Sequence, residues 1–177
     1  MARLALLCFA LLSATPALAF DPVDAPAFEA IDVDGQAIAV GGQRDRPVVL
    51  FFWATWCPYC KQFMPHLQSI VDEYGGVDVL SISVFEEDDG DPAGYLEEYG
   101  FEFRLVEEGE AIASEYGVRG TPGVFVVDTE GRIRWHLGLA MQDEERVAGL
   151  SKHWQRATRR APFWAAELRG ALDAVTP

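Results

Sequence analysis

The chain has few cysteines and few histidines, and this scarcity limits the metal chemistry open to it. It carries three of each. Cys57 and Cys60 are separated by two residues, whereas Cys8 lies in an apolar run near the N-terminus. A structural zinc site needs four ligands, usually two cysteine pairs or one pair with histidines at finger spacing. Because the histidines are scattered, we expect no metal at the cysteine pair.

Positive charge is also scarce. The sequence has 14 lysines and arginines against 28 aspartates and glutamates, a net charge of -14. A phosphate backbone repels such a chain, so nucleic acid is excluded as its main partner. Between Glu86 and Glu115, Arg104 is the only base. This acidic stretch is either a solvated face or a surface that attracts a basic partner.

Long apolar runs are missing as well. The apolar run 4–12 is far shorter than the roughly 20 residues that span a bilayer. It follows Arg3 and precedes the small-x-small pattern Ala17-Leu18-Ala19, as in a secretory signal peptide. We expect residues 1–19 to be removed as a signal peptide and 20–177 to form a single periplasmic domain, where disulfides can form. An uncleaved signal that anchors the chain to a membrane is the alternative.

The patterning predicts alternating strands and helices. Residues 48–54 and 77–84 are β-branched and aromatic runs, typical of strands buried on both faces. Between them, Pro58 suits the first position of a helix. The apolar residues of this helix recur at three- and four-residue spacing until Gly75-Gly76 ends the helix. Pro65 should kink it.

The second half predicts further elements of both kinds. Strands at 123–128 and 132–137 are joined by Thr129-Glu130-Gly131, a hairpin signal. With the earlier elements they predict an α/β fold whose sheet has mixed strand directions. The other expected elements are helices at 92–99, 110–116, 143–160 and, after Pro162, 163–175, and a strand at 103–107.

The cysteine pair has three interpretations: a zinc clip, a structural disulfide and a redox-active dithiol. A disulfide across two residues closes too small a loop for much chain-entropy stabilisation. The strand-to-helix junction favours redox chemistry. Cys57 would lie at the helix N-terminus, where free N–H groups and the helix dipole favour its thiolate. Cys60, one turn later and more covered, would suit the step that releases a mixed disulfide.

Several motifs resemble one known superfamily. The segments "FWATWCPYC", "MP" and "YGVRGTPGVFVVDTEGRI" are similar to those of the thioredoxin superfamily, and most to its exported TlpA/ResA/DsbE-like thiol–disulfide oxidoreductases. The resemblance covers about 26–137 and the last helix. It implies a thioredoxin fold with a mixed central sheet, a central insert at about 75–103 and a C-terminal helical extension. Residues 139–161 look like a helical insertion into that pattern.

The resemblance also assigns site residues. It makes Cys57 the attacking and Cys60 the resolving cysteine, with their redox-active disulfide in place of any cofactor. It places Thr121 and Pro122 in a cis-proline loop that faces the dithiol, where the Thr121 backbone can pair with an extended substrate. The residues expected to support the site or contact substrate are Trp53, Trp56, Pro58, Tyr59, Thr121 and Pro122.

The activity implied is reduction of protein disulfides, in cytochrome c maturation or copper-oxidase assembly, by a monomer supplied with electrons by a membrane protein of the DsbD/CcdA kind. An oxidase or isomerase of the DsbA/DsbC kind remains open, because small differences in reduction potential decide direction. A Sco-like copper chaperone, using His66 or His136, is disfavoured by the two-residue spacing. A peroxidase is disfavoured because no Thr-x-x-Cys stands before the dithiol.

Two departures from the family concern the proton of Cys60. Thioredoxin keeps an aspartate where this chain has Phe51, and ResA-like members keep a glutamate where it has Phe63. An apolar surround raises the pKa of a buried thiol. Water, or an acid from elsewhere such as the loop 86–91, would have to accept the proton.

Overall fold

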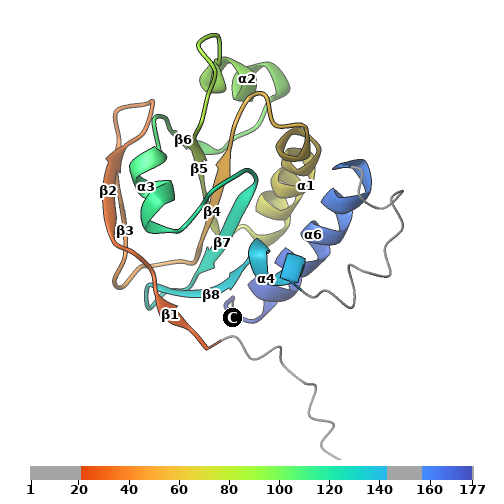
Figure 1. Cartoon of the computed structure of the whole chain (residues 1–177). Coiled ribbons are helices and arrows are strands. Elements are labelled where there is room, and N and C mark those ends of the chain that lie inside the picture. The colour runs from red at the N-terminus through yellow and green to blue at the C-terminus, as the bar shows by residue number, and fades with distance from the viewer. Residues whose placement is uncertain (1–20, 143–156, 177) are drawn as a thin grey trace, which may run out of the picture.

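The computed structural model of the protein describes residues 21–142 and 157–176, and these build a central six-stranded sheet (Figure 1). The sheet order is β1-β8-β7-β4-β5-β6, and β2 and β3 form a separate hairpin. The strands are β1 (Val23–Asp24), β2 (Phe28–Ile31), β3 (Ala37–Val40), β4 (Val48–Trp53), β5 (Asp78–Ser83), β6 (Arg104–Val106), β7 (Gly123–Val127) and β8 (Arg132–His136). The helices are α1 (Pro58–Tyr74), α2 (Pro92–Tyr99), α3 (Glu110–Glu115), α4 (Leu137–Gln142) and α6 (Ala157–Asp173).

Strand β4 is the centre of the sheet. It pairs parallel with β5 and antiparallel with β7, so that Phe51 lies opposite Ser81 on one side and Val124 on the other. All six of its residues are buried, as the continuous apolar run predicted. The mixed sheet and the α/β fold are therefore confirmed. The range 75–103, which was expected to be a central insert, contains β5 and α2. Strand β5 belongs to the central sheet, and α2 adds Leu96 to the core beside that sheet.

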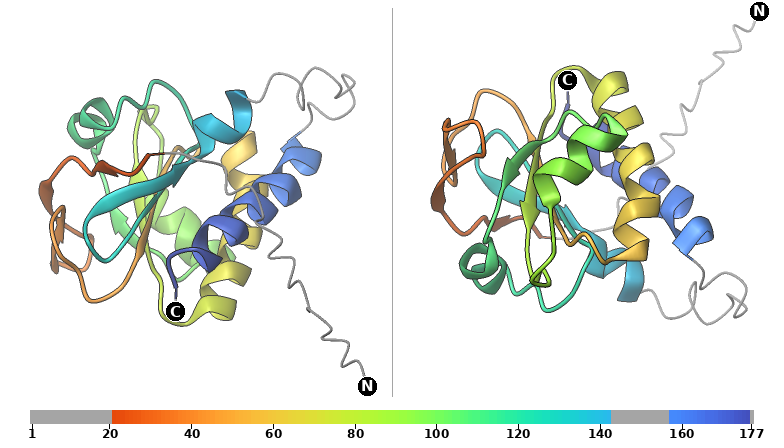
Figure 2. Two further views of the ribbon diagram at one scale, coloured as in Figure 1. Left: turned by 90° about the horizontal axis from the view of Figure 1, so that it is seen from below. Right: turned by 90° about the horizontal axis from the view of Figure 1, so that it is seen from above.

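Helices α1 and α6 cover one face of the sheet, and α3 and the β2–β3 hairpin cover the other (Figure 2). The alternate residues Val49, Phe51 and Trp53 of β4 share one core with α1 and α6, to which α2 adds Leu96. The other β4 residues form a second core with α3 and the β2–β3 hairpin. Period-two alternation along one strand thus divides the interior in two.

Helix α1 begins and ends where its punctuating residues predict. Cys57 is its N-cap, Pro58 takes the first position, and Gly75 ends it in the left-handed conformation with φ 38°. Glycine adopts that conformation without the Cβ penalty of other residues. Pro65 stands inside the helix, which continues past it to Tyr74.

The C-terminal helix differs from the prediction. It spans Ala157–Asp173 and includes Pro162, which was expected to separate two helices. An interior proline costs a helix about 3 kcal/mol. Burial of Ala161, Trp164 and Leu168 in the core against α1 offsets that cost. The expected signal peptide, and residues 143–156 of the expected helical stretch, lie outside the described residues.

An ion pair ties the β2–β3 turn to β6. The Asp32 carboxylate accepts hydrogen bonds from Arg104 Nη2 at 2.8 Å and from the Gln36 N–H at 2.7 Å. Burial by itself raises the pKa of Asp32, but the hydrogen bonds from Gln36 and Arg104 outweigh it and hold the pKa below its usual value. The hairpin is therefore held to the sheet edge by a charge-assisted contact.

We predict that Arg104→Met lowers the free energy of unfolding at pH 7. Since the pKa of Asp32 is depressed in the folded state, its stabilisation is complete above the unfolded value of about 3.9 and is lost as pH falls through the folded value. Urea unfolding should show that the difference in the free energy of unfolding between variant and wild type becomes smaller below about pH 3. Arg46→Met, which removes an exposed ion pair to Asp78, is the control, and an equal loss there would contradict the prediction.

Candidate active site

The Cys57–Cys60 disulfide lies at the junction between the end of β4 and the start of α1. After β4 ends at Trp53, the turn from Ala54 to Cys57 is closed by the Cys57 N–H, which donates to the Ala54 carbonyl at 3.1 Å. The Cys60 N–H donates to Cys57 Sγ at 3.2 Å. The two Cα atoms are 5.3 Å apart. The first sulfur therefore occupies the N-cap of α1, at the positive end of the helix dipole.

Both cysteines are buried, which differs from the expectation that Cys57 would be the more accessible. Cys57 is 1% exposed and Cys60 0%. They belong to the core that α1 shares with β4 and α6. A partner sulfur therefore reaches Cys57 only when neighbouring side chains shift.

Aromatic rings fill the two positions where the family resemblance implied an acid. Phe51 and Phe63 are fully buried, with ring centroids 5.8 Å apart. Phe51 also stacks on Trp53, and Phe63 meets Trp164 of α6 edge-on. These four rings form the aromatic cluster. It surrounds the dithiol with an apolar medium that disfavours a charged sulfur at Cys60.

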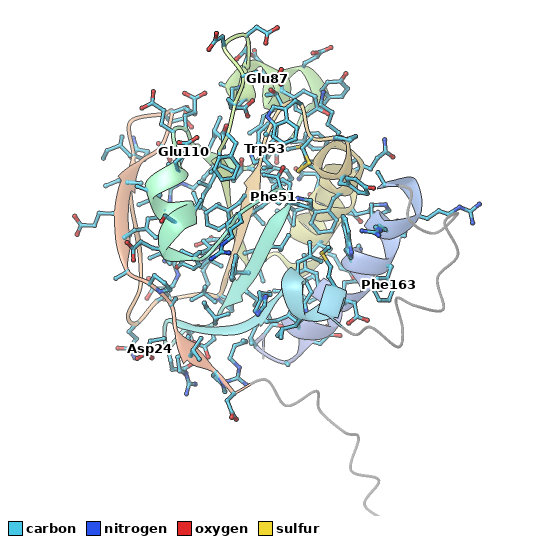
Figure 3. All side chains as sticks on the ribbon, viewed as in Figure 1. Asp24, Phe51, Trp53, Glu87, Glu110 and Phe163 are labelled. Atoms are coloured by element: carbon cyan, nitrogen blue, oxygen red, sulfur yellow. A yellow bond between two sulfur atoms is a disulfide. The ribbon has the colours of Figure 1, made fainter. Side chains whose placement is uncertain are left out.

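The two tryptophans before the disulfide have different environments. Trp53 is fully buried, and its indole N–H donates to Ser81 Oγ at 2.8 Å. Figure 3 places Trp53 and Phe51 inside the molecule, beside α1. Trp56 is 46% exposed, and its indole N–H donates to the Phe85 carbonyl at 2.6 Å. Trp53 is therefore a core residue, and Trp56 is the one that a partner can touch.

The next two predicted site residues lie on the first turn of α1. Pro58 is exposed at the first helical position. Tyr59 is half-buried and turned toward α6, with its ring 6.0 Å from Trp164 and under the Arg160 guanidinium at 5.7 Å. Pro58 is open to a partner, whereas Tyr59 packs between the two helices.

The loop before β7 approaches the same end of β4. The Thr121–Pro122 peptide bond is cis, as expected. Gly123, the next residue, pairs with Phe52 at the end of the β4–β7 ladder, so the loop lies next to the end of β4. The Thr121 hydroxyl oxygen is buried and finds no hydrogen-bond partner among the described residues. The structure thus brings Thr121 and Pro122 to the turn that carries Cys57.

A third segment completes the site, the loop after β5. The Glu86 carboxylate accepts hydrogen bonds from the Thr55 N–H and from the hydroxyls of Thr55 and Ser83. Phe85 has a positive φ of 57°, and its N–H donates to the Glu110 carboxylate at 2.7 Å. Figure 3 shows Glu110 on α3 and Glu87 in this loop. The sequence indicated the loop 86–91 as a source of acid, but no local signal singled out Glu86.

A carboxylate-lined pocket of about 370 Å³ lies between this loop and α1. Thr55, Trp56 and Lys61 form its wall nearest the disulfide. Opposite them stand Glu87, Asp89, Asp91, Tyr95 and Glu98. The approach to Cys57 on this side is therefore negatively charged.

The histidines considered for copper lie on separate elements. His66 is half-buried on α1, and His136 ends β8 with its ring stacked on Phe125 at 5.6 Å. Burial lowers the pKa of His136. Within residues 21–142 and 157–176, no three His, Cys, Asp or Glu side chains gather as a metal site. In the same part of the chain no helix has the length and apolarity to cross a membrane.

Comparison with known proteins finds relatives in sequence and in fold. Residues 23–136 match the model of the AhpC/TSA family. The thiol-disulfide oxidoreductase ResA of Bacillus thuringiensis is 28% identical over 132 residues, 73% of this chain and 75% of the relative.

Solved structures show the same fold at lower identity. A putative thiol:disulfide interchange protein DsbE from Chlorobium tepidum superposes with a TM-score of 0.56 at 22% identity, over 73% of this chain and 97% of the other. StoA from Bacillus subtilis gives 0.54 at 20% identity, over 63% and 83%. The expected thioredoxin-like fold is confirmed.

We predict that Trp53→Phe destabilises the protein more than Trp56→Phe does. The first change leaves the buried Ser81 hydroxyl without its donor, which costs about 1–3 kcal/mol. The second removes one surface hydrogen bond, and such changes usually stay within about 0.5 kcal/mol. Urea unfolding of both oxidised variants measures the difference, and equal losses would show that Trp53 is not the structural residue.

Proposed function

We propose that this chain, which belongs to the AhpC/TSA family, is an exported thiol–disulfide oxidoreductase that reduces disulfides in protein partners. One observation carries the proposal: a disulfide at the N-terminus of α1 packs in the same core as a buried aromatic cluster, and the residues that flank it in the chain line a pocket with four carboxylates. The thiol–disulfide class follows from the family and the disulfide. The direction of the reaction and its cellular setting are what we propose.

The reduced form performs the reaction in two exchanges. The Cys57 thiolate attacks one sulfur of the partner disulfide, which forms a mixed disulfide and releases the other partner sulfur as a thiolate that takes up a proton. Cys60 then loses its proton and attacks Cys57 Sγ, which releases the second partner thiol. Two electrons pass to the partner, and the Cys57–Cys60 disulfide is left behind.

The charges around the site support reduction over oxidation. A dithiol is a strong oxidant when its reduced form is stabilised, which a thiolate-favouring environment achieves. Nearby carboxylates act in the opposite sense, because a like charge disfavours the Cys57 thiolate. The aromatic cluster also disfavours charge on Cys60. Both effects make the reduced form a better electron donor.

The setting follows from the sequence. A signal peptide over 1–19 would export the chain to the periplasm, and its relatives are named as a thiol-disulfide oxidoreductase and a thiol:disulfide interchange protein. Each turnover leaves a disulfide, so the proposal requires an external dithiol donor, a membrane protein of the DsbD/CcdA kind. Cytochrome c maturation or assembly of a copper-containing oxidase is the proposed context, and the working form is a monomer.

We predict that Cys60→Ser accumulates a mixed disulfide through Cys57 in cells, because the second exchange is blocked. Non-reducing electrophoresis followed by mass spectrometry identifies the trapped protein. Cys57→Ser is the matched control and should trap nothing, since it lacks the attacking sulfur. Equal trapping by both variants, or by neither, would count against protein-disulfide exchange through Cys57.

We predict further that the Cys57–Cys60 pair is largely reduced in growing cells. Acid quenching and a thiol-alkylating mass tag separate the reduced and oxidised forms on a gel. A fully oxidised pool would contradict reduction and favour an oxidase or isomerase of the DsbA/DsbC kind. A donor requirement predicts that the pool becomes oxidised when the membrane donor is removed.

A further inference from the structure

Glu86 differs from the acids that follow it in the β5–α2 loop. Glu87, Asp88, Asp89 and Asp91 are exposed, whereas Glu86 is half-buried. Glu87, Asp89 and Asp91 line the pocket, and Glu86 instead turns toward the active-site turn. Its position is therefore set by contacts inside the protein.

Those contacts join the ends of two parallel strands. The Glu86 carboxylate accepts the Thr55 N–H at 2.9 Å and the Ser83 hydroxyl at 2.8 Å, and it also accepts the Thr55 hydroxyl. Ser83 is the last residue of β5. Thr55 lies inside the turn that runs from Ala54 to Cys57. The carboxylate thus fastens the turn that carries the attacking sulfur to the neighbouring strand.

The loop folds closely over this carboxylate. A Cβ placed on Gly90 would lie 2.6 Å from Glu86 Oε2, closer than real Cβ atoms approach. The Gly90 N–H closes a turn by donating to the Glu87 carbonyl at 2.8 Å. The absent side chain at Gly90 is therefore what leaves room for Glu86 against Thr55.

Other charged and titratable groups around the turn are accounted for. Lys61 lies over the Tyr95 ring at 5.0 Å and is the base that lines the pocket. Glu110 accepts the Phe85 N–H. The other charged groups that line the pocket are the carboxylates of Glu87, Asp89, Asp91 and Glu98. Asp88 is exposed in the same loop, and Arg160 lies over the Tyr59 ring on the α6 side. Glu86 is distinguished from them by its direct bond to the backbone two residues before Cys57.

We propose that Glu86 is a positioning residue for thiol–disulfide exchange, which holds the Ala54–Cys57 turn against β5 and sets a negative charge at Thr55, two residues before Cys57. The charge opposes the helix dipole, which favours the Cys57 thiolate. Glu86 therefore acts on Cys57 through the turn, and it does not replace the proton acceptor for Cys60 that positions 51 and 63 lack. The proposal rests on the oxidoreductase chemistry but not on its direction.

The test compares Glu86→Gln with Glu87→Gln in the reduced, purified protein. Both remove one negative charge, but only Glu86 contacts the turn. The pH dependence of iodoacetamide reaction gives the pKa of Cys57. Removal of one nearby negative charge, at a dielectric between protein surface and water, should lower the pKa of Cys57 by about 0.5–1 units in Glu86→Gln. Glu87→Gln should shift it by less than about a third of that amount, because exposed charges are screened.

Equilibration with glutathione provides a second readout. Above the pKa of Cys57, Glu86→Gln should favour the reduced form about three- to tenfold, the same factor as its pKa shift. Well below that pKa the variant and the wild type should have the same ratio of reduced to oxidised protein, because a neutral thiol does not interact with the charge. A purely structural role would give no such pH dependence, and equal behaviour of both glutamine variants would overturn the proposal.

Two further variants separate charge from position. Glu86→Asp keeps the charge on a side chain too short to make all of the hydrogen bonds of Glu86, so the pKa of Cys57 should fall by less than in Glu86→Gln while the melting temperature also falls. Gly90→Ala should displace the carboxylate and lower the pKa of Cys57 although no charge is removed. Gly120→Ala, whose Cβ would meet nothing within 4 Å, is its control. A wild-type protein that proves to be an oxidant would refute the reductase direction but leave the shift in Glu86→Gln intact.

Discussion

Burial of β4 on both faces, between a parallel and an antiparallel neighbour, is the constraint on which the site depends. Its position in the sheet fixes where the chain emerges, and the turn to α1 follows at once. The neighbouring strands β5 and β7 then bring their own residues to the end of β4. The end of β5 supplies Ser83 and the Glu86 loop, and the start of β7 supplies Thr121 and Pro122. The disulfide is therefore surrounded by segments that hydrogen bonding across one strand has brought together.

The aromatic cluster changes how the second sulfur can react. Phe51 and Phe63 extend the hydrophobic core up to Cys60, which gains apolar burial and loses a local proton acceptor. A thiol in such a medium holds its proton tightly. We therefore expect the Cys60 proton to pass to water only in the mixed-disulfide state, when a bound partner opens the site. Stability of the core and speed of the resolving step oppose one another here.

The sequence predicted those parts of the fold that local patterns determine. The buried runs of β4 and β5, and the proline and glycine at the ends of α1, act over a few residues, so their elements were found within one or two positions. The short strands β1, β2 and β3 were missed, because two to four residues with exposed positions carry little periodic signal. Pro162 was wrongly taken as a break, since only the packing of α6 on α1 reveals what offsets it.

The candidate site shows the same limit more sharply. The disulfide and the cis-proline loop were predicted from motifs, but the separate environments of Trp53 and Trp56 depend on which face of the chain meets the sheet. Thr55 and Glu86 lie 31 positions apart, so no local pattern could connect them. That contact matters because the fold alone does not set redox direction. The N-terminus of α1 favours the thiolate, and in our proposal the Glu86 carboxylate opposes it through the turn. Since small differences in potential decide direction, one charge held at this turn is enough to shift the balance between reduction and oxidation.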